Sequence, residues 1–275
     1  MGTHPIDHAS FRKIAEFIRF KSGIVLDETK SYLIETRLGP LLDELQIDSY
    51  LELCRSASRD QRVLNRLLDE ITTNETSFFR DRSPFELLKF KLLPELMDRR
   101  GASTQPINIW SAASSTGQEV YSIAMACSEI LPAQALARVR LVGTDLSRQA
   151  VERASRGEYS LFELERGLDA TLRQRHFREQ GGRWRVRDEL RALASFRQLN
   201  LLEPFGSLGA FDIVFCRNVA IYFQLETRRQ LFERIARQLK PGGTLVIGSS
   251  ETLQGVTSHF ERRMHMNCAY YLVTC

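Results

Sequence analysis

Apolar residues at helical spacing dominate the first part of the chain. Runs with this spacing are found in residues 11–18, 32–45 and 60–72. Another helix is expected to begin just after Asp48 or Ser49, because either side chain can cap the first free N–H groups. No alternating strand pattern interrupts this part. We therefore predict a small all-helical N-terminal domain over residues 1–73.

The pattern changes after a connecting helix whose basic end precedes Gly101. Short apolar runs predict strands, and the segments between them have helical spacing. The strands are expected at 107–112, 139–144, 211–216 and 244–248, and the helices at 118–130, 148–156 and 226–239. Strand–helix alternation with nearly continuous apolar strands is typical of a parallel sheet covered on both faces. We predict a doubly wound α/β domain over residues 101–275, joined to the helical domain by a linker motif and helix at 74–100.

An Arg-rich segment interrupts this alternation. Gly181-Gly182 predicts a turn into a short strand at 183–187, with 193–198 as a possible partner strand. We therefore expect a small β-subdomain inserted at about residues 178–198. Residues 138–197 contain fourteen Arg, no Lys and nine acidic residues, whereas residues 1–73 contain ten basic and twelve acidic ones. A binding surface for an acidic partner and an ordinary solvated face explain this local charge equally well.

Composition narrows the class of protein. The chain has 275 residues, a net charge of +4, 43% hydrophobic and 26% charged residues, as in a globular protein. No apolar run approaches the roughly 18 residues of a membrane span, and the N-terminus has no signal pattern, so we expect a cytoplasmic protein without membrane insertion. Five scattered Cys indicate neither a disulfide framework nor a zinc ribbon, and no metal site is predicted. A monomer is expected because no long apolar stripe is left unused.

Candidate chemistry lies in the loops that follow the predicted strands, where ligands bind in open parallel sheets. The first loop, 111–119, consists of small residues but lacks the G-x-G-x-x-G pattern, which argues against a dinucleotide. Asp145 follows the second strand and can either accept ribose hydroxyls or cap the next helix. Asn200 can read an adenine edge or satisfy turn backbone. Arg217 and Asn218 stand between two apolar runs, where burial is costly unless a site satisfies them.

Five motifs occur in register. They are N-E-T-S-F-F-R-D at 74–81, W-S-A-A-S-S-T-G-Q-E-V-Y-S-I-A-M at 110–125, G-T-D-L-S at 143–147, F-C-R-N-V-A-I-Y-F at 215–223 and L-K-P-G-G-T-L-V-I-G-S-S-E at 239–251. Together they resemble the CheR family of chemoreceptor glutamate O-methyltransferases, which use S-adenosylmethionine (SAM). The resemblance implies a class I SAM-dependent methyltransferase, with a Rossmann-like doubly wound sheet, an all-α N-terminal domain and a small inserted β-subdomain. Family members often have Gly-Glu-Glu-Pro where this chain has Gly-Gln-Glu-Val at 117–120.

The resemblance also implies roles for residues in the first three motifs. Asn74, Thr76 and Arg80 would reach the cofactor and the active site. Glu119 and Asp145 would hold the cofactor, with Asp145 bound to its ribose. S-adenosylhomocysteine (SAH) would be the product that leaves this site.

The remaining implied roles fall on the later loops. Asn200 and Leu201 would lie along the adenine, and Arg217 and Asn218 would contact the methionine portion of the cofactor or its surroundings. Tyr222, with the linker arginine, would flank the transferring methyl group and the substrate carboxylate. These two side chains, Arg80 and Tyr222, are the expected catalytic residues.

The implied chemistry suits the residues present. A glutamate has a reference pKa near 4.3, so at pH 7 the nucleophile is already an anion and no general base is needed. The five histidines all lie outside the candidate motifs. The implied partner is the cytoplasmic helical bundle of a chemoreceptor, and a receptor C-terminal peptide can dock on the β-subdomain by adding a strand to its edge.

Other functions remain open from sequence alone. The chain can be a SAM-dependent methyltransferase of another protein carboxylate, or a non-catalytic SAM sensor. A nicotinamide dehydrogenase is disfavoured by the missing glycine pattern. A nucleic-acid methyltransferase is disfavoured because the N-terminal domain is slightly acidic, so no nucleic-acid partner is expected.

Overall fold

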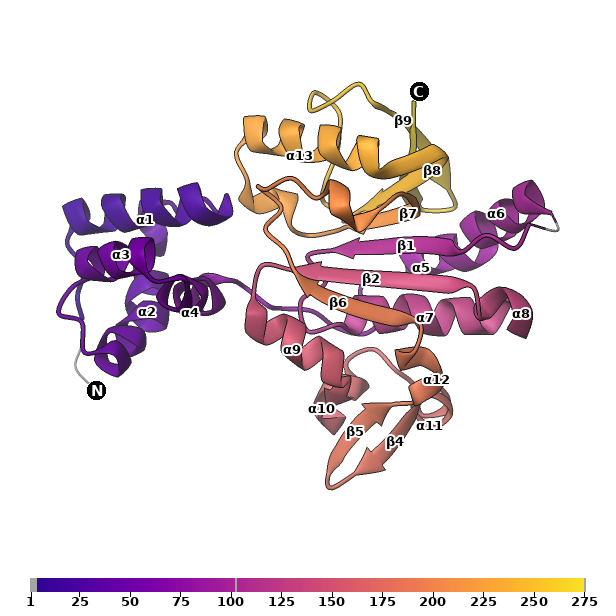
Figure 1. Ribbon diagram of the computed structural model, residues 1–275, viewed down its shortest axis with the longest axis horizontal. Coiled ribbons are helices and arrows are strands. Elements are labelled where there is room, and N and C mark those ends of the chain that lie inside the picture. Colours follow the sequence, from indigo (N-terminus) through magenta and orange to yellow (C-terminus); the bar gives the residue numbers. More distant parts are fainter. Residues whose placement is uncertain (1–3, 102, 275) are drawn as a thin grey trace.

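The computed structural model describes residues 4–101 and 103–274, and its N-terminal part is entirely helical (Figure 1). The expected helices are confirmed, and Ser49 rather than Asp48 caps the third of them by accepting from Glu52 N. The elements are α1 (His8–Ser22), the 3₁₀ turn η1 (Glu28–Lys30), α2 (Ser31–Leu45), α3 (Tyr50–Arg59) and α4 (Gln61–Ile71). They enclose their own apolar core, which includes the fully buried Ile14, Leu38 and Leu67. No helix within the described ranges is long and apolar enough to cross a membrane.

Seven strands form the main sheet in the order β6-β2-β1-β7-β8-β10-β9. The strands are β1 (Ile107–Ala112), β2 (Val139–Asp145), β6 (Ala194–Gln198), β7 (Phe211–Cys216), β8 (Leu239–Ile247), β9 (Phe260–His265) and β10 (Cys268–Val273). The first five are parallel, and β10 runs antiparallel to β8 and β9. Counted in chain order within this sheet, the arrangement is 3-2-1-4-5-7-6, with the switch in strand order between β1 and β7. The expected doubly wound α/β fold is confirmed.

Alternate residues of the central strands enter two different cores. Ile109, Ile213 and Phe215 face one core, while Trp110 and Val214 face the other. This period of two explains why the strands are apolar throughout, because both faces of the sheet are covered. The helices of this domain are α5 (Ser83–Leu87), a π-turn η2 (Leu88–Leu92), α6 (Leu93–Arg100), α7 (Gln118–Ile130), α8 (Ala133–Leu136), α9 (Arg148–Arg156) and α13 (Leu225–Gln238), with 3₁₀ turns η3 (Gly206–Leu208) and η4 (Ala220–Tyr222).

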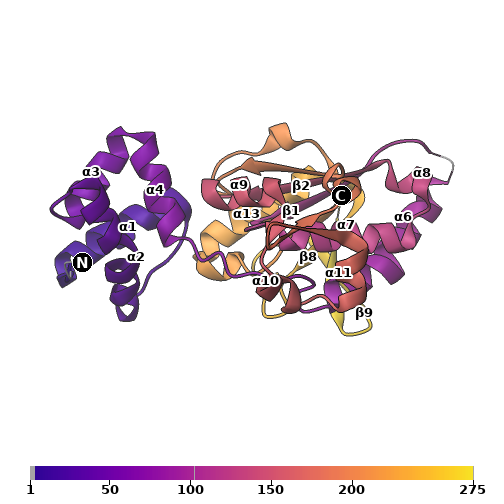
Figure 2. The same ribbon diagram turned by 90° about the horizontal axis from the view of Figure 1, so that it is seen from below.

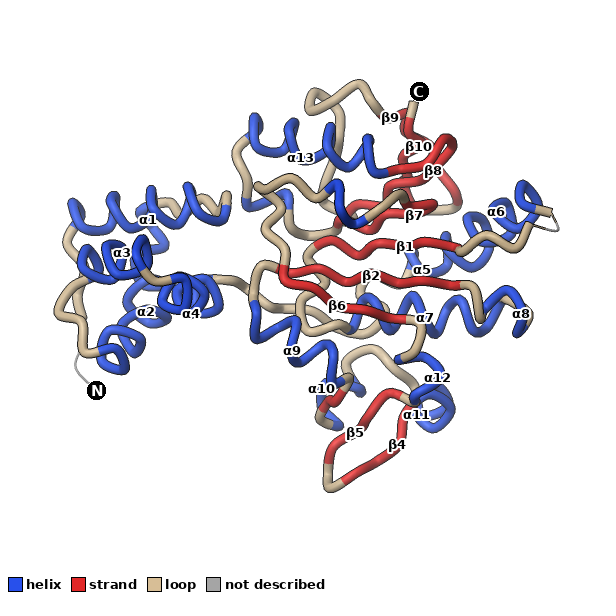
Figure 3. Tube along the Cα trace, in the orientation of Figure 1, coloured by secondary structure: helices blue, strands red, loops and turns tan. Residues whose placement is uncertain are grey.

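The Arg-rich segment forms a separate small sheet, seen beside the main one in Figure 3. Its strands are β3 (Glu158–Tyr159), β4 (Phe177–Gln180) and β5 (Arg183–Val186), and its short helices are α10 (Leu161–Glu165), α11 (Ala170–His176) and α12 (Asp188–Arg191). The expected partner strand at 193–198 was wrong. Residues 194–198 are β6, which pairs with β2 in the main sheet. The partners of β5 are β3 and β4 on either side, and both lie upstream of the Gly-Gly turn.

The last part of the chain also differs from the expectation. The strand expected at 244–248 begins already at Leu239, and a register irregularity near its start accommodates residues 240–243. The β9–β10 hairpin was not predicted. Because β9 lies at the edge of the sheet, four of its six side chains are exposed and three of these are charged, so it lacks the apolar signal of a central strand.

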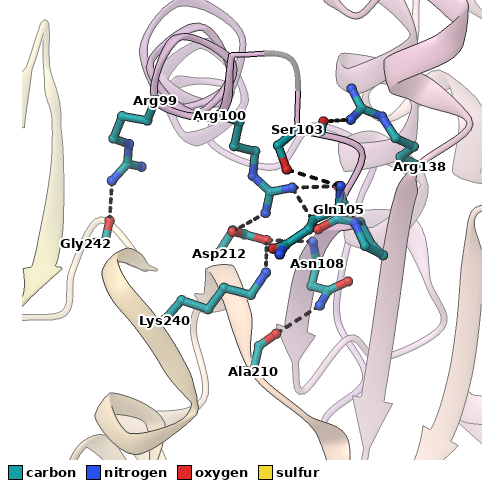
Figure 4. Close-up of polar contacts among 11 residues, drawn as sticks. Arg99, Arg100, Ser103, Gln105, Asn108, Arg138, Ala210, Asp212, Lys240 and Gly242 are labelled. Carbon is teal, nitrogen blue, oxygen red and sulfur yellow. Dashed lines mark hydrogen bonds and ion pairs between the residues drawn. The ribbon is translucent and has the colours of Figure 1, made fainter.

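A buried carboxylate ties four elements together at the amino ends of the central strands (Figure 4). Asp212 in β7 accepts from Arg100 Nη2 of α6 at 2.5 Å and from Lys240 Nζ of β8 at 2.9 Å. It also accepts from the backbone N–H of Asn108 in β1 at 2.8 Å. Only 6% of the Asp212 side chain is exposed. This cluster therefore fixes the amino ends of β1, β7 and β8 relative to one another.

Asp212→Ala is expected to lower the free energy of unfolding by about 3 kcal/mol, because it leaves two cations unpaired at a nearly buried position. Urea titration monitored by circular dichroism measures this loss. Arg62→Ala is the matched control, since Arg62 pairs with Asp60 while 89% of its side chain is exposed. That surface variant is expected to lose less than about 1 kcal/mol. Equal losses in the two variants would contradict the assignment of Asp212 as an anchor.

Candidate active site

A cavity lies where the carboxyl ends of the strands face the helical domain, with β1 and β2 pointing toward that domain in Figure 1. It encloses about 920 Å³, its open mouth included. Both domains and the linker between them contribute to its wall. Its lining residues are Ser22, Ile24, Thr72, Thr73, Asn74, Glu75, Thr76, Arg80, Ala113, Ser114, Ser115, Glu119, Asp145, Leu146, Leu199, Asn200, Leu201, Arg217, Asn218, Val219, Tyr222 and Phe223. All ten site residues expected from the sequence are among them.

Asp145 lies at the end of β2, in the wall of the cavity. Its carboxylate accepts from the backbone N–H groups of Ser115 at 2.7 Å and Ser147 at 2.9 Å. Ser147 rather than Asp145 caps α9, since its hydroxyl accepts from Ala150 N. Burial raises the pKa of Asp145 above its usual value, although these backbone donors act in the opposite direction. The side chain is thus a nearly buried acceptor held in place by two loops.

Arg217, in the loop that follows β7, bonds to the first turn of α7 and to the linker between the two domains. Its Nη1 donates to Glu119 Oε2 at 2.7 Å. Its Nη2 donates to the Arg80 carbonyl at 2.9 Å and to Asp81 Oδ2 at 2.8 Å. Only 1% of the Arg217 side chain is exposed. Of its guanidinium nitrogens only Nε lacks a partner among the described residues, and the bonds made by the other two fix the backbone that carries Arg80.

The linker has an unusual backbone around Arg80. Phe79, Asp81 and Arg82 have φ values of 48°, 66° and 44°, a region that residues other than glycine seldom adopt. The Phe79 N–H donates to Ser122 Oγ of α7 at 2.9 Å, which helps to hold this turn. As a result the Arg80 side chain lines the cavity, where its Nη1 donates to the Glu75 carbonyl at 3.1 Å. Such outliers, held by their surroundings, are often found at functional sites.

The helical domain contributes Ser22 and Ile24 to the cavity wall. Figure 2 shows this domain beside the sheet-containing domain, with the linker running between them. Asn200 Nδ2 donates to the Lys21 carbonyl at 2.7 Å, and its Oδ1 accepts from Leu202 N at 3.0 Å. The Val25 N–H donates to the carbonyl of Tyr222 at 3.0 Å. The amide of Asn200 is therefore used within the protein, joining the two domains beside the cavity.

Sequence reasoning missed the part of the wall that comes from the helical domain. Ser22 is the last residue of α1 and Ile24 lies just beyond it, and no local pattern distinguishes them from other residues at a helix end. The sequence did not single out Ser114, which is one of several small residues in the loop 111–119. Its position becomes informative in the structure, because its hydroxyl is buried and has no hydrogen-bond partner among the described residues.

These features fit a nucleoside with a charged tail. The carboxylate of Asp145 can accept ribose hydroxyls, and the unpartnered Ser114 hydroxyl offers a further polar contact in the same wall. Glu119 and Arg217 place one charge of each sign in the same wall, where the two side chains pair with each other. Within the described residues no group of His, Cys, Asp or Glu is arranged to hold a metal ion.

A sheet in this order, with a nucleoside-sized cavity at its switch point and no glycine-rich dinucleotide loop, defines a class I SAM-dependent methyltransferase. Comparisons with known proteins agree. The SAM-binding domain of CheR methyltransferases matches residues 74–268, and their all-alpha domain matches residues 9–72. The chain therefore belongs to the CheR methyltransferase family, whose function is the methylation of chemoreceptors in chemotaxis, and it is an enzyme that uses SAM.

Curated relatives are similar along nearly their whole length. Chemotaxis protein methyltransferase 1 of Pseudomonas aeruginosa is 43% identical over 92% of this chain and 94% of that protein. The chemotaxis protein methyltransferase of Vibrio parahaemolyticus is 41% identical over 93% and 94%, respectively. Chemotaxis protein methyltransferase Cher2 of Pseudomonas putida is 41% identical over 95% of each chain.

Proposed function

We propose that this protein converts glutamate side chains in the cytoplasmic helical bundle of a chemoreceptor to methyl esters, acting as a monomer in the cytoplasm. The observation that carries the proposal is the meeting of Arg80 and Tyr222 with the cofactor loops in one open cavity. Tyr222 is 37% exposed, which leaves its side chain accessible to a protein substrate.

Within this cavity we assign the cofactor to the wall formed by Asp145, Glu119, Asn74 and Thr76, with Leu201 beside the adenine. When bound, SAM supplies a methyl group on a positively charged sulfur, and SAH is the product. Because the amide of Asn200 is engaged with Lys21 and Leu202, its role is to shape the adenine wall rather than to read the adenine edge.

A second group of residues handles the substrate. The Arg80 guanidinium attracts and orients the glutamate carboxylate, and the Tyr222 hydroxyl donates a hydrogen bond to it. Asn218 and Arg217 support the methionine end of the cofactor site. Since the carboxylate is ionised at pH 7, the protein needs no base, and its contribution is positioning and the exclusion of water.

The β-subdomain is assigned to docking. β4 lies at the edge of the small sheet, and Arg178, Glu179 and Gln180 on it are exposed. An edge strand can pair with an extended peptide, and the arginines of β5 favour an acidic one. We propose that a receptor C-terminal peptide binds there as an added strand.

The experiment is transfer of radiolabel from methyl-labelled SAM to purified chemoreceptor cytoplasmic fragments, with and without their C-terminal tail. We expect label that is released by base as methanol, is lost when the modified glutamates are changed to alanine, and accumulates more slowly without the tail. SAM binding without base-labile label on any receptor would reject the proposed substrate. Equal rates on both fragments would reject the docking role of the β-subdomain alone.

A further inference from the structure

Glu251, the last residue of the fifth motif, has no part in the site described above, yet its carboxylate binds the loop that carries much of it. Oε2 accepts from the backbone N–H groups of Gly248 at 2.7 Å and Asn218 at 2.8 Å. Oε1 accepts from Ala220 N at 3.1 Å. One side chain thus joins the end of β8 to the turn after β7.

The turn held by Glu251 forms part of the cavity wall. Asn218, Val219 and Tyr222 from this turn line the cavity. Asn218 has a φ of 56°, which costs a non-glycine residue free energy unless its surroundings hold it. The bond from its N–H to Glu251 is one such restraint.

The fit between these two loops leaves no spare room. A Cβ on Gly248 would lie 2.6 Å from Glu251 Oε2 and 3.1 Å from the backbone nitrogen of Asn218. The glycine therefore permits the carboxylate to reach the turn. A charged acceptor at this position also bonds backbone N–H groups more strongly than a neutral one.

The carboxylate of Glu251 also affects the buried thiol of Cys216. Burial raises the pKa of Cys216 well above its usual value, and Glu251 and Glu119 raise it further. Cys216 ends β7, directly before Arg217 and Asn218. Glu251 and Glu119 therefore both act electrostatically on Cys216, the last residue of β7 before the cavity wall.

We propose that Glu251 is a positioning residue for methyl transfer, which sets the backbone of residues 218–220 and, through it, the side chains of Asn218 and Tyr222. The proposal rests on the proposed function, because it takes the cavity as the site of cofactor and substrate. Glu251 itself contacts neither. Its loss leaves three backbone donors without their acceptor and frees the turn to shift.

The test measures SAH binding by calorimetry and the kcat and KM of receptor methylation for Glu251→Ala and Glu251→Gln. For the alanine variant we expect SAH binding about tenfold weaker and kcat about a hundredfold lower, since a 1 Å displacement can cost that much. The glutamine variant keeps one accepting oxygen for the shared Gly248 and Asn218 donors, so it should fall between the wild type and alanine. An intermediate activity of the glutamine variant distinguishes a positioning role of the carboxylate oxygens from an effect of side-chain volume alone.

Asp212→Ala is the matched control, because Asp212 anchors the same strands, β7 and β8, at their amino ends, away from the cavity. It should lower the unfolding midpoint while the folded enzyme keeps wild-type SAH affinity and kcat. If Glu251→Ala behaves like Asp212→Ala, with reduced stability but unchanged binding and turnover, the proposal is overturned. If the wild type itself fails to bind SAH, the proposed function fails instead.

Gly248→Ala provides a second route to the same displacement without removing the carboxylate, and it serves if Glu251→Ala does not fold. The new methyl group pushes Glu251 and Asn218 apart, so we expect a loss of kcat in the same direction as for Glu251→Gln. Wild-type kinetics in both Gly248→Ala and Glu251→Gln would also overturn the proposal.

Discussion

Arg80→Ala is expected to lower kcat for receptor methylation by a hundredfold or more, with a smaller effect on SAH affinity. The guanidinium lines the cavity and is held there by the strained turn of the linker, so its removal leaves the substrate carboxylate without its orienting cation. Arg80→Lys should recover only part of the activity, since an ammonium cannot present the planar pair of donors. Steady-state methylation kinetics and SAH calorimetry measure the two effects separately.

Arg82→Ala is the control for Arg80. Arg82 lies in the same turn, and its backbone is also at positive φ, but its side chain is exposed and is not part of the cavity wall. Its removal changes the local charge equally and should leave kcat within about twofold of the wild type. Retention of most activity by Arg80→Ala, or an equal loss in both variants, would show that Arg80 has no specific role.

Asp145→Ala is expected to weaken SAM and SAH binding by a hundredfold or more. The substitution removes the acceptor proposed for the ribose, and it also releases the Ser115 and Ser147 backbone donors that shape the two loops. Asp169→Ala is the control, because Asp169 also accepts a backbone N–H, from Leu172 of α11, outside the cavity. Unchanged calorimetric affinity in Asp145→Ala would exclude it as the cofactor anchor.

The same carboxylate predicts a pH dependence. Burial raises the folded-state pKa of Asp145, so the folded protein holds this proton more tightly than the unfolded chain does. The group therefore favours folding at acid pH, and that contribution is lost as the pH rises through its folded pKa. The ionised form is the better acceptor for ribose hydroxyls, so SAH affinity should fall as the pH drops through this raised pKa. In Asp145→Asn, this acid limb should disappear.

The periodicity of apolar residues in the sequence predicted the fold well for elements that have one buried face or are fully buried. β1, β7 and α7 agree with the predicted bounds. The failures have a common physical cause, since β9 and β6 gain their order from neighbouring strands rather than from their own apolar residues. β6 was placed in the wrong sheet because it is the next strand along the chain after β5 and therefore resembles a hairpin partner.

The candidate site was predictable where strand ends carry unusual polar residues. Arg217 and Asn218 between apolar runs, and Asp145 after β2, are such cases, and the family motifs added the linker residues. The contribution of Ser22 and Ile24 was not predictable, because it depends on how the helical domain lies against the sheet. The engagement of Asn200 with Lys21 is of the same kind, a contact across 179 positions of sequence.

The spread of the cavity wall along the chain has a consequence for biosynthesis. Its lining begins at Ser22 and ends at Phe223, and the carboxylate that braces the last of these loops comes later still, at Glu251. A nascent chain on the ribosome therefore has no complete binding site until translation has passed the codon of Glu251. The cofactor therefore cannot guide the early stages of folding. The helical domain and the sheet must assemble by their own packing before a bound ligand can stabilise them.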